Sequence, residues 1–419
     1  MAELKRVLGF WEATLAGVGV ILGAGIYALL GAGVGMAGNG VWLSLVVGAV
    51  LAALTGLSYA ELSSMMPKAG AEFSYAEKAF GKKTAFLTGW LFVVSGIVGC
   101  TTVALGFGGY LNALAGVPIW LAAVAVLGVS TFLLLLGVKD SVLLAVVFTL
   151  VEAGGLVLVV LLAVPFYGSV DLLSFPGWGG VLGAAALMFF AFLGFEDVAK
   201  LAEETRNACV VIPRALLASI AISAVFYVLV AVASLALVGV GGLSGSSAPL
   251  AVVAGKALGG NGFLLLSVIA LFATSNTVVL LELATSRVVY GMARASCLPS
   301  RLSVVSKQGV PWLATVVVGF IAALFVFAGD VAFAAKITDF AVFVVFFVVN
   351  AAVVRLRFLV PGARRPFRVW GSVAGVPVAP VAGAFSCLVL LASLGWEAVV
   401  GGFVLVLVGA AVFFVLRWQ

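Results

Sequence analysis

The chain has 419 residues, of which 64% are hydrophobic and only 9% are charged, with 22 Lys and Arg against 16 Asp and Glu. Soluble domains are about half apolar and about a quarter charged, so this composition excludes a water-soluble globular protein. The sequence contains no His, which excludes a Ser-His-Asp triad and metal sites built on imidazole. Its four cysteines are scattered without a CxxC spacing, so we expect them to be small packing residues, and we expect no metal and no cofactor.

The hydrophobic runs are continuous and lack the two-residue alternation of a membrane β-barrel. A membrane helix needs about 20 apolar residues, so the composition suffices for about a dozen spans in an all-α polytopic membrane protein. The first run is too long and too Gly-rich for a cleavable signal peptide. In chain order the predicted spans are 10–31, 41–66, 84–115, 118–137, 141–165, 180–203, 212–239, 262–293, 312–330, 334–354, 377–394 and 397–416.

The basic residues predict how these spans are oriented. With both termini in the cytoplasm, 20 of the 22 Lys and Arg residues fall on the inner side, and only Lys256 and Lys336 fall outside. The net charge of +6 is therefore a signal of membrane topology, and we expect a lipid bilayer but no nucleic acid as a partner. The Gly- and Ser-rich segment 239–262 is predicted to be an outer loop with a short surface helix at 249–258, and 355–370 an inner loop.

Two predicted spans contain glycines that would interrupt a helix at mid-depth. The first span has four glycines between Gly17 and Gly25, and the sixth has Gly194 followed by Glu196 and Asp197. Non-helical backbone at this depth is stable only where it lines an enclosed or wet cavity, and its free N–H and C=O groups can bind an anion and a cation. Glycines also permit close helix packing, but interruptions in spans one and six are what an inverted repeat of five helices requires.

Several motifs occur in order and at consistent intervals along the chain. They are 23–27 (GAGIY), 58–70 (SYAELSSMMPKAG) leading to Tyr75, 189–196 (FFAFLGFE), 202–205 (AEET), 212–215 (IPRA) and 286–294 (SRVVYGMAR). Over about residues 7 to 370 the sequence resembles the amino acid–polyamine–organocation transporters. The resemblance implies a LeuT-type fold in one domain, residues 1–419, with inverted repeats at about 8–168 and 178–356 and two extra helices at about 375–417.

The resemblance also implies a function and a binding site. We expect a secondary transporter, and no enzyme, that moves a small-molecule amino acid across the cell membrane by alternating access. The amino-acid carboxylate is expected at the backbone N–H groups of the first interruption, and the ammonium at backbone carbonyls of both interruptions. Phe192 and Phe195 are expected either to form the wall and gate of the site or to be ordinary core residues. The expected substrate-binding residues are Ile21, Gly23, Ala24, Gly25 and Ile26 in the first span and Phe190, Ala191, Phe192, Leu193, Gly194 and Phe195 in the sixth.

Two acidic residues at membrane depth are candidates for coupling transport to an ion. Glu152 lies 11 residues after Ser141, about 17 Å along a helix, among apolar sequence neighbours. We interpret Glu152 as a proton carrier, as a cation ligand near the first interruption or as a neutral structural acid. Proton-coupled members of the resembled family often have Lys at this position, so the Glu argues against coupling through a lysine ammonium. Glu282 shares a helix face with Ser275 and Ser286 and has the same coupling or structural alternatives.

The eighth span also carries the hydroxyls of Thr274, Ser275 and Thr277. They are either cation ligands or are bonded back to their own helix, as is common for Ser and Thr in membrane helices. At the inner helix ends, ion pairs are expected between acidic residues and basic residues of the loops. The acids are Glu61, Glu203 and Glu204, and the basic candidates include Arg214, Arg287 and Arg294.

The favoured function is therefore amino-acid transport with a proton, more than sodium, as the coupling ion. An exchanger and a sodium-coupled symporter are the alternatives within transport, and a membrane channel or ligand sensor is the alternative outside it. An intramembrane enzyme is disfavoured because Asp330 and Asp339 lack a paired-acid motif and no Lys lies at mid-depth to activate a Ser nucleophile. The particular amino acid and the oligomeric state stay open.

Overall fold

The computed structural model describes residues 8–66, 71–137, 142–201, 204–306 and 309–416, and nearly all of them are helical. This confirms the predicted all-α class. The main helices are α1 (Phe10–Ile21), α2 (Gly25–Ala37), α3 (Val41–Met65), α4 (Ala71–Phe80), α5 (Lys82–Ala115), α6 (Ile119–Leu135), α7 (Val142–Leu162), α8 (Trp178–Met188), α9 (Asp197–Lys200), α10 (Ala208–Val238), α11 (Val240–Leu243), α12 (Pro249–Leu258), α13 (Gly260–Arg294), α14 (Trp312–Phe325), α15 (Val331–Leu359), α16 (Val378–Ser393) and α17 (Trp396–Leu416). The remaining elements are the 3-10 turns η1 (Gly38–Gly40), η2 (Val164–Phe166), η3 (Phe189–Phe192) and η5 (Ser300–Ser303), and a hairpin of β1 (Ser372–Val373) and β2 (Val376–Pro377).

The chain is a multi-pass membrane protein. Among the described residues, eight helical stretches are long and apolar enough to cross a membrane, and five further apolar helices have 10–17 residues. Large apolar side chains remain exposed on α6, α7, α14 and α17. Such a surface is unfavourable in water but suits a bilayer. Examples are Phe132, Leu150, Phe320 and Leu407, each at least 60% exposed.

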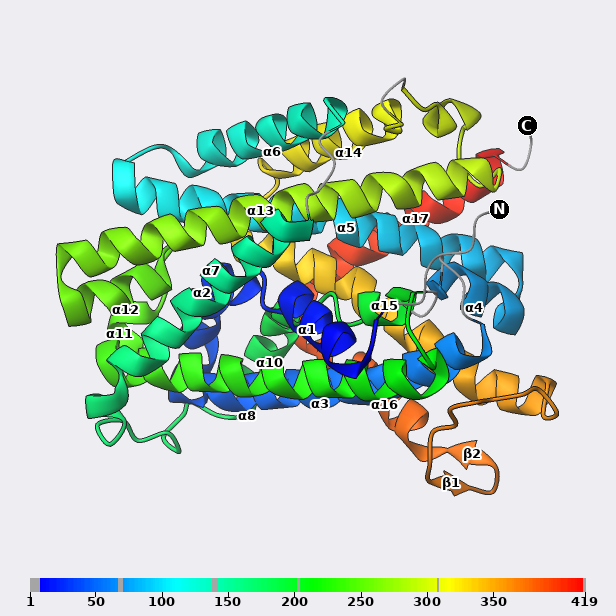
Figure 1. The fold of residues 1–419 in the computed structure, drawn as a ribbon, viewed down its shortest axis with the longest axis horizontal. Coiled ribbons are helices and arrows are strands. Elements are labelled where there is room, and N and C mark those ends of the chain that lie inside the picture. The colour runs from blue at the N-terminus through cyan, green and yellow to red at the C-terminus, as the bar shows by residue number, and fades with distance from the viewer. Residues whose placement is uncertain (1–7, 67–70, 138–141, 202–203, 307–308, 417–419) are drawn as a thin grey trace.

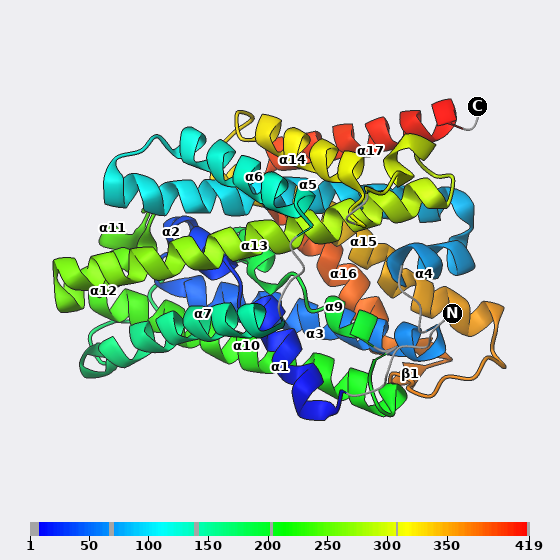
Figure 2. The ribbon, with the colours of Figure 1, turned by 45° about the horizontal axis from the view of Figure 1, so that its top comes forward.

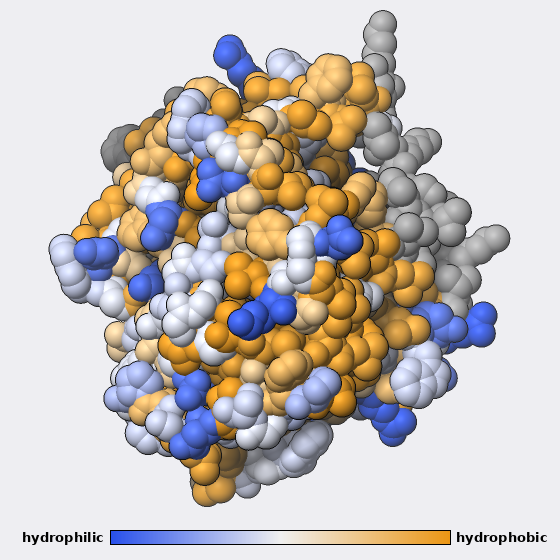
Figure 3. Space-filling model, turned by 90° about the vertical axis from the view of Figure 1, so that its left-hand side faces the viewer, coloured by the Kyte–Doolittle hydropathy of each residue, from blue (hydrophilic) through white to orange (hydrophobic). Residues whose placement is uncertain are grey.

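Most of the long helices run roughly along the long axis of the molecule (Figures 1 and 2). Helix α5 lies at the centre, buried along most of its length and packed against α13 and α15. Helix α4 and the hairpin lie at one end, and α11 and α12 lie at the other. The end with α11 and α12 has hydrophilic residues scattered among hydrophobic ones (Figure 3).

Each predicted span contains at least one helix, and the predicted short helix at 249–258 is confirmed as α12, with one face buried against α13. Helix α4 and the hairpin are among the elements that were not predicted from the sequence. The basic stretch after the second span contains α4, and the inner loop after α15 contains the hairpin. The cysteines are free thiols; Cys100 and Cys387 are buried, and Cys209 and Cys297 are partly exposed.

The predicted ion-pair partners of Glu61 are wrong. Its carboxylate accepts hydrogen bonds from Arg357 Nε at 3.0 Å and Nη2 at 2.6 Å, and Arg365 Nε lies 3.4 Å away. The backbone N–H of Val369 adds a bond of 2.8 Å to the same carboxylate. This arrangement cannot be predicted from the order of the spans, because it depends on α15 packing beside α3 and on the loop after α15 folding back over the end of α3. Of the other two acids, Glu203 lies outside the described residues, and Glu204 accepts a bond from the N–H of Leu8 through its backbone carbonyl.

Replacing the buried acid should destabilise this end of the molecule. In Glu61→Gln, two guanidinium groups lose their counter-charge, and breaking a buried pair from one side costs about 3–5 kcal/mol. We expect a clear fall in the thermal unfolding temperature of the detergent-purified protein, whereas Glu397→Gln, at an exposed position, should leave it unchanged. Equal unfolding temperatures for the two variants would contradict a stabilising role for the Glu61 pair.

Candidate functional site

The first predicted interruption is present between α1 and α2. Helix α1 ends at Ile21 and α2 begins at Gly25, so three residues, Leu22, Gly23 and Ala24, interrupt the helix between them. All three are buried. The backbone N–H of Ala24 donates to Thr277 Oγ1 of α13 at 3.3 Å. The first N–H groups of α2 therefore lie in the interior of the protein, and they have no acceptors within their own helix.

The second interruption lies in the predicted sixth span. Helix α8 ends at Met188, η3 follows, and a short turn leads to α9. Gly194 has a φ of +103°, which L side chains rarely adopt, so this turn needs glycine. The N–H of Gly194 donates to Glu196 Oε2 at 3.0 Å, which explains why an acid follows the glycine so closely.

The two interruptions meet, although they are far apart in the sequence. The hydroxyl of Tyr227 on α10 is within hydrogen-bond distance of the carbonyl oxygens of both Ile21 and Ala191, the latter at 2.8 Å. One hydroxyl has one proton, so these carbonyls share a single donor. A Cβ on Gly25 would lie 2.6 Å from the Cα of Ala191, so the backbones are in direct contact.

The aromatic residues of the sixth span divide between two surroundings. Phe192 packs edge-on against Tyr227, with ring centroids 5.3 Å apart, and so covers the point where the interruptions meet. Phe195 belongs to a cluster with Phe346 and Tyr59, at 5.3 and 6.0 Å. The predicted substrate-binding residues are all buried except Leu193, which is partly exposed. The structure thus brings both sets of residues together in the interior of the protein.

Glu152 is buried on α7 and has a polar partner that its sequence neighbours do not supply. The side-chain amide of Asn276 on α13 donates to Glu152 Oε1 at 3.3 Å. The backbone carbonyl of Glu152 accepts a bond of 2.6 Å from the hydroxyl of Tyr27 on α2. Because Thr277, next to Asn276, contacts the first interruption, two adjacent residues of α13 connect that interruption to Glu152. Neither Asn276 nor Tyr227 was predicted as a site residue.

Glu282 lies in different surroundings on the same helix. Its Oε1 accepts a hydrogen bond of 2.5 Å from Thr131 on α6, and a Cβ on Gly319 of α14 would lie 2.7 Å from that oxygen. The partner is therefore α6, whereas the hydroxyls of Ser275 and Ser286 donate to carbonyls of their own helix. This geometry favours the structural interpretation of Glu282.

The three hydroxyls of the eighth span are not equivalent. Thr274 and Ser275 donate to carbonyls one turn earlier in α13, at 2.7 and 2.6 Å. Thr277 also donates to its own helix, at 2.9 Å, but its oxygen accepts from Ala24 at the first interruption. Thr277 is therefore the hydroxyl of this group that the structure connects to the candidate site.

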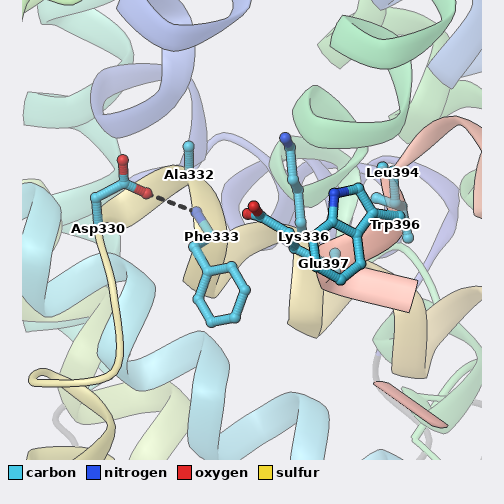
Figure 4. A pocket seen from close by; sticks show the side chains of 9 residues that line it. Asp330, Ala332, Phe333, Lys336, Leu394, Trp396 and Glu397 are labelled. Carbon is cyan, nitrogen blue, oxygen red and sulfur yellow. Dashed lines mark hydrogen bonds between the residues drawn. The ribbon is translucent and has the colours of Figure 1, made fainter. Parts of the chain in front are cut away.

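A separate cavity of about 380 Å³ lies between the start of α15 and the turn from α16 to α17. Lys336, Trp396 and Glu397 line it, and Asp330 at its edge accepts a bond from the N–H of Phe333 (Figure 4). None of the residues predicted to bind substrate lines this cavity. We therefore place the candidate site at the interruptions.

Comparison with known proteins decides the family. A family model described as "Amino acid permease" matches residues 8–415, nearly the whole chain. The chain belongs to the amino acid permease family. The predicted resemblance to amino acid–polyamine–organocation transporters is thereby confirmed, and amino-acid transport with it.

Individual permeases and transporters resemble the chain over most of its length. It is 30% identical to the branched-chain amino acid permease BcaP of Bacillus subtilis, covering 98% of this chain and 93% of the relative. It is 27% identical to the methylthioribose transporter of the same organism, with the same coverage. A vacuolar cationic amino acid transporter 4 of Arabidopsis thaliana is 29% identical over 86% of this chain and 64% of the relative. The three relatives are named for different substrates, so the family alone does not fix the substrate of this permease.

The backbone contact between the interruptions gives a direct test of the site. Gly25→Ala would place a Cβ against Ala191, which we expect to cost about 1–3 kcal/mol of stability and to lower amino-acid uptake by about tenfold or more. Gly128→Ala is the matched control, because an added Cβ there meets nothing within 4 Å. Uptake of radiolabelled leucine and lysine into proteoliposomes is the measurement. Similar uptake by both variants would show that this contact is unimportant for transport.

Proposed function

We propose that this permease is a secondary transporter that binds an amino acid at the junction of the two helix interruptions and moves it by alternating access. The observation that carries the proposal is the shared donor at that junction. The carbonyls of Ile21 and Ala191 converge on one hydroxyl, that of Tyr227. An ammonium group has several N–H donors and can serve both carbonyls at once, which one hydroxyl cannot do.

The start of α2 supplies the complementary charge. A helix N-terminus offers N–H groups without intrahelical acceptors and a positive dipole end, which favours a carboxylate. Ala24 has no side-chain hydroxyl, so carboxylate binding here would rest on the backbone of residues such as Gly23 and Gly25. A site with carbonyls on one side and amides on the other suits the zwitterionic part common to all amino acids. The aromatic wall at Phe192 would then contact the side chain.

We assign Glu152 as the proton carrier of this cycle. The acid is 2% exposed, its side-chain hydrogen-bond partner among the described residues is a neutral amide, and Asn276 and Thr277 connect it to the first interruption. A carboxyl in such surroundings is held more favourably as the neutral acid, so it can bind and release a proton as the site rearranges. A sodium ion would instead use the Thr277 hydroxyl and backbone carbonyls beside Ala24.

For the architecture we propose the LeuT-type arrangement with two inverted repeats, at about 8–168 and 178–356, and two extra helices. In this arrangement twelve spans place both termini in the cytoplasm and the protein in the cell membrane. The positions of the two interruptions and the distribution of Lys and Arg support it. Rocking of the first, second, sixth and seventh spans against the rest would open the site to one side at a time.

Removing the Tyr227 hydroxyl tests whether the substrate amine uses the same carbonyls. Tyr227→Phe leaves both carbonyls without this donor, which should cost about 1–3 kcal/mol in the substrate-free protein. An added amino acid supplies new donors, so leucine or lysine should raise the unfolding temperature of the variant more than that of the native protein. Tyr167→Phe, which removes a partly exposed hydroxyl bonded to Val160, is the control. An equal thermal shift in variant and native protein would contradict amine binding at this point.

Uptake driven by defined gradients tests the coupling ion. Proteoliposomes with an alkaline interior should accumulate the labelled amino acid, while a sodium gradient alone should not drive uptake. Glu152→Gln should keep exchange of internal for external substrate but accumulate clearly less substrate in response to the pH gradient, whereas Glu282→Gln should accumulate as much as the native protein. An unchanged pH response in Glu152→Gln would rule out Glu152 as the carrier, and uptake that needs only preloaded substrate would identify an exchanger.

A further inference from the structure

A further buried acid, Asp339, lies beside the second interruption, and the proposed function gives it no role. It is the ninth residue of α15, about 12 Å along the axis from the start of that helix. Its side chain is fully buried, and neither carboxylate oxygen has a hydrogen-bond partner among the described residues. Buried carboxylates are normally paired or hydrogen-bonded, so an acid without either calls for a functional explanation.

Contacts of α15 place Asp339 beside η3. Phe343 lies one turn after Asp339 on the same helix face, and its ring packs against Phe189 with centroids 5.0 Å apart. The backbone amide of Phe190 in η3 is the polar group that lies near the Asp339 carboxyl, although it is outside good hydrogen-bond geometry. Asp339 therefore adjoins the residues that carry the Ala191 carbonyl of the candidate site.

Charged neighbours do not compensate Asp339. No side chain of the described residues forms an ion pair with it, and α8 and η3, which are described in full, contain no titratable residue. On its own helix, Lys336 lines the cavity near Glu397 (Figure 4). On the other elements packed against α15, four titratable residues have hydrogen-bond partners elsewhere: Tyr27 (bonded to the Glu152 carbonyl), Tyr59 (bonded to Glu72), Glu61 (paired with Arg357) and Tyr110 (bonded to the Tyr27 carbonyl). The other titratable residues on these elements are Glu72, Tyr75, Glu77 and Lys78 on α4, Lys82 and Lys83 at the start of α5, Cys100 (near Glu282), Cys387 (near Thr55) and Glu397.

The surroundings of Asp339 select one kind of ligand. Both carboxylate oxygens are enclosed, so a metal ion or an amine would need space and further ligands around it. A proton needs no space, and it removes the cost of holding an unpaired charge in an apolar interior. We propose that Asp339 is a second proton-binding site of the transport cycle, which holds its proton while η3 covers it and exchanges it with water when η3 moves.

The position of Asp339 mirrors that of Glu152. Glu152 is on the fifth predicted span and is connected to the interruption of the first span, and Asp339 is on the tenth span beside the interruption of the sixth. Glu152 is the eleventh residue of α7 and Asp339 the ninth of α15. In an inverted five-helix repeat these are equivalent places, so each repeat contributes one acid next to its own interruption.

The step itself is a simple proton transfer. When η3 moves away from α15, the neutral carboxyl gives its proton to water on the open side and becomes a carboxylate. It takes up a proton from water on the other side before η3 closes again. This inference rests on the proposed function, because a proton bound in the cycle has an effect on accumulation only if the permease couples transport to protons.

The number of protons carried per substrate provides the test. With the membrane potential clamped at zero, a gradient of one pH unit supports about tenfold accumulation for one proton and about a hundredfold for two. Native protein in proteoliposomes should therefore accumulate labelled leucine or lysine about a hundredfold. Asp339→Asn and Glu152→Gln should each reach about tenfold, and the double variant should only equilibrate. Asp330→Asn is the matched control on the same helix, because this exposed N-cap residue can be replaced by Asn without loss of the cap.

The outcomes separate this inference from the proposed function. Equal accumulation by Asp339→Asn and native protein overturns the role of Asp339 while leaving amino-acid transport and Glu152 intact. Native protein that ignores the pH gradient overturns proton coupling as a whole. If Asp339→Asn does not fold, Asp339→Ser poses the same question. Loss of a protonated-carboxyl band from the substrate-induced infrared difference spectrum of the variant would support the proposal independently of uptake, and retention of every such band would overturn it.

Discussion

The hydrogen bonds of the interrupted backbone determine how the rest of this permease is arranged. A helix that stops inside a membrane leaves N–H and C=O groups that no water can reach, and each needs a partner from the protein. Here these partners come from other helices: Tyr227 for the carbonyls of Ile21 and Ala191, and Thr277 for the N–H of Ala24. The interruptions therefore fix where α10 and α13 lie.

Small residues allow the junction to form. The backbones around Gly25 and Ala191 touch, and Gly194 adopts a conformation that disfavours other residues. Large aromatic rings surround this small-residue centre, with Phe192 on Tyr227 and Phe195 in a separate cluster. In the proposed site, a centre that depends on backbone atoms would recognise the part common to all amino acids. Differences in substrate side chain must then be read by the surrounding wall, which fits a family whose members are named for different substrates.

The sequence was informative where the signal is local. Glycines at Gly23, Gly25 and Gly194 predicted both interruptions, because glycine in a membrane helix has a direct effect on its own backbone. The partners were not predictable in this way. Tyr227 lies in an apolar run, where it cannot be distinguished from a core aromatic residue. Asn276 lies among Thr274, Ser275 and Thr277, whose hydroxyls are equally good candidates for a polar site. The Arg357 partner of Glu61 was missed for the same reason, since it lies 296 residues away in the chain.

The buried acids show why depth alone does not assign a role. Glu152, Glu282 and Asp339 are all carboxyls inside long apolar helices, and the sequence could not separate them. Their contacts do: Glu282 bonds to α6 through Thr131, away from the interruptions, whereas Glu152 and Asp339 each adjoin one interruption. An acid that stabilises packing between helices needs only a constant partner. The surroundings of an acid that couples transport must change when the substrate binds or leaves. Only backbone that can rearrange beside the acid provides that change.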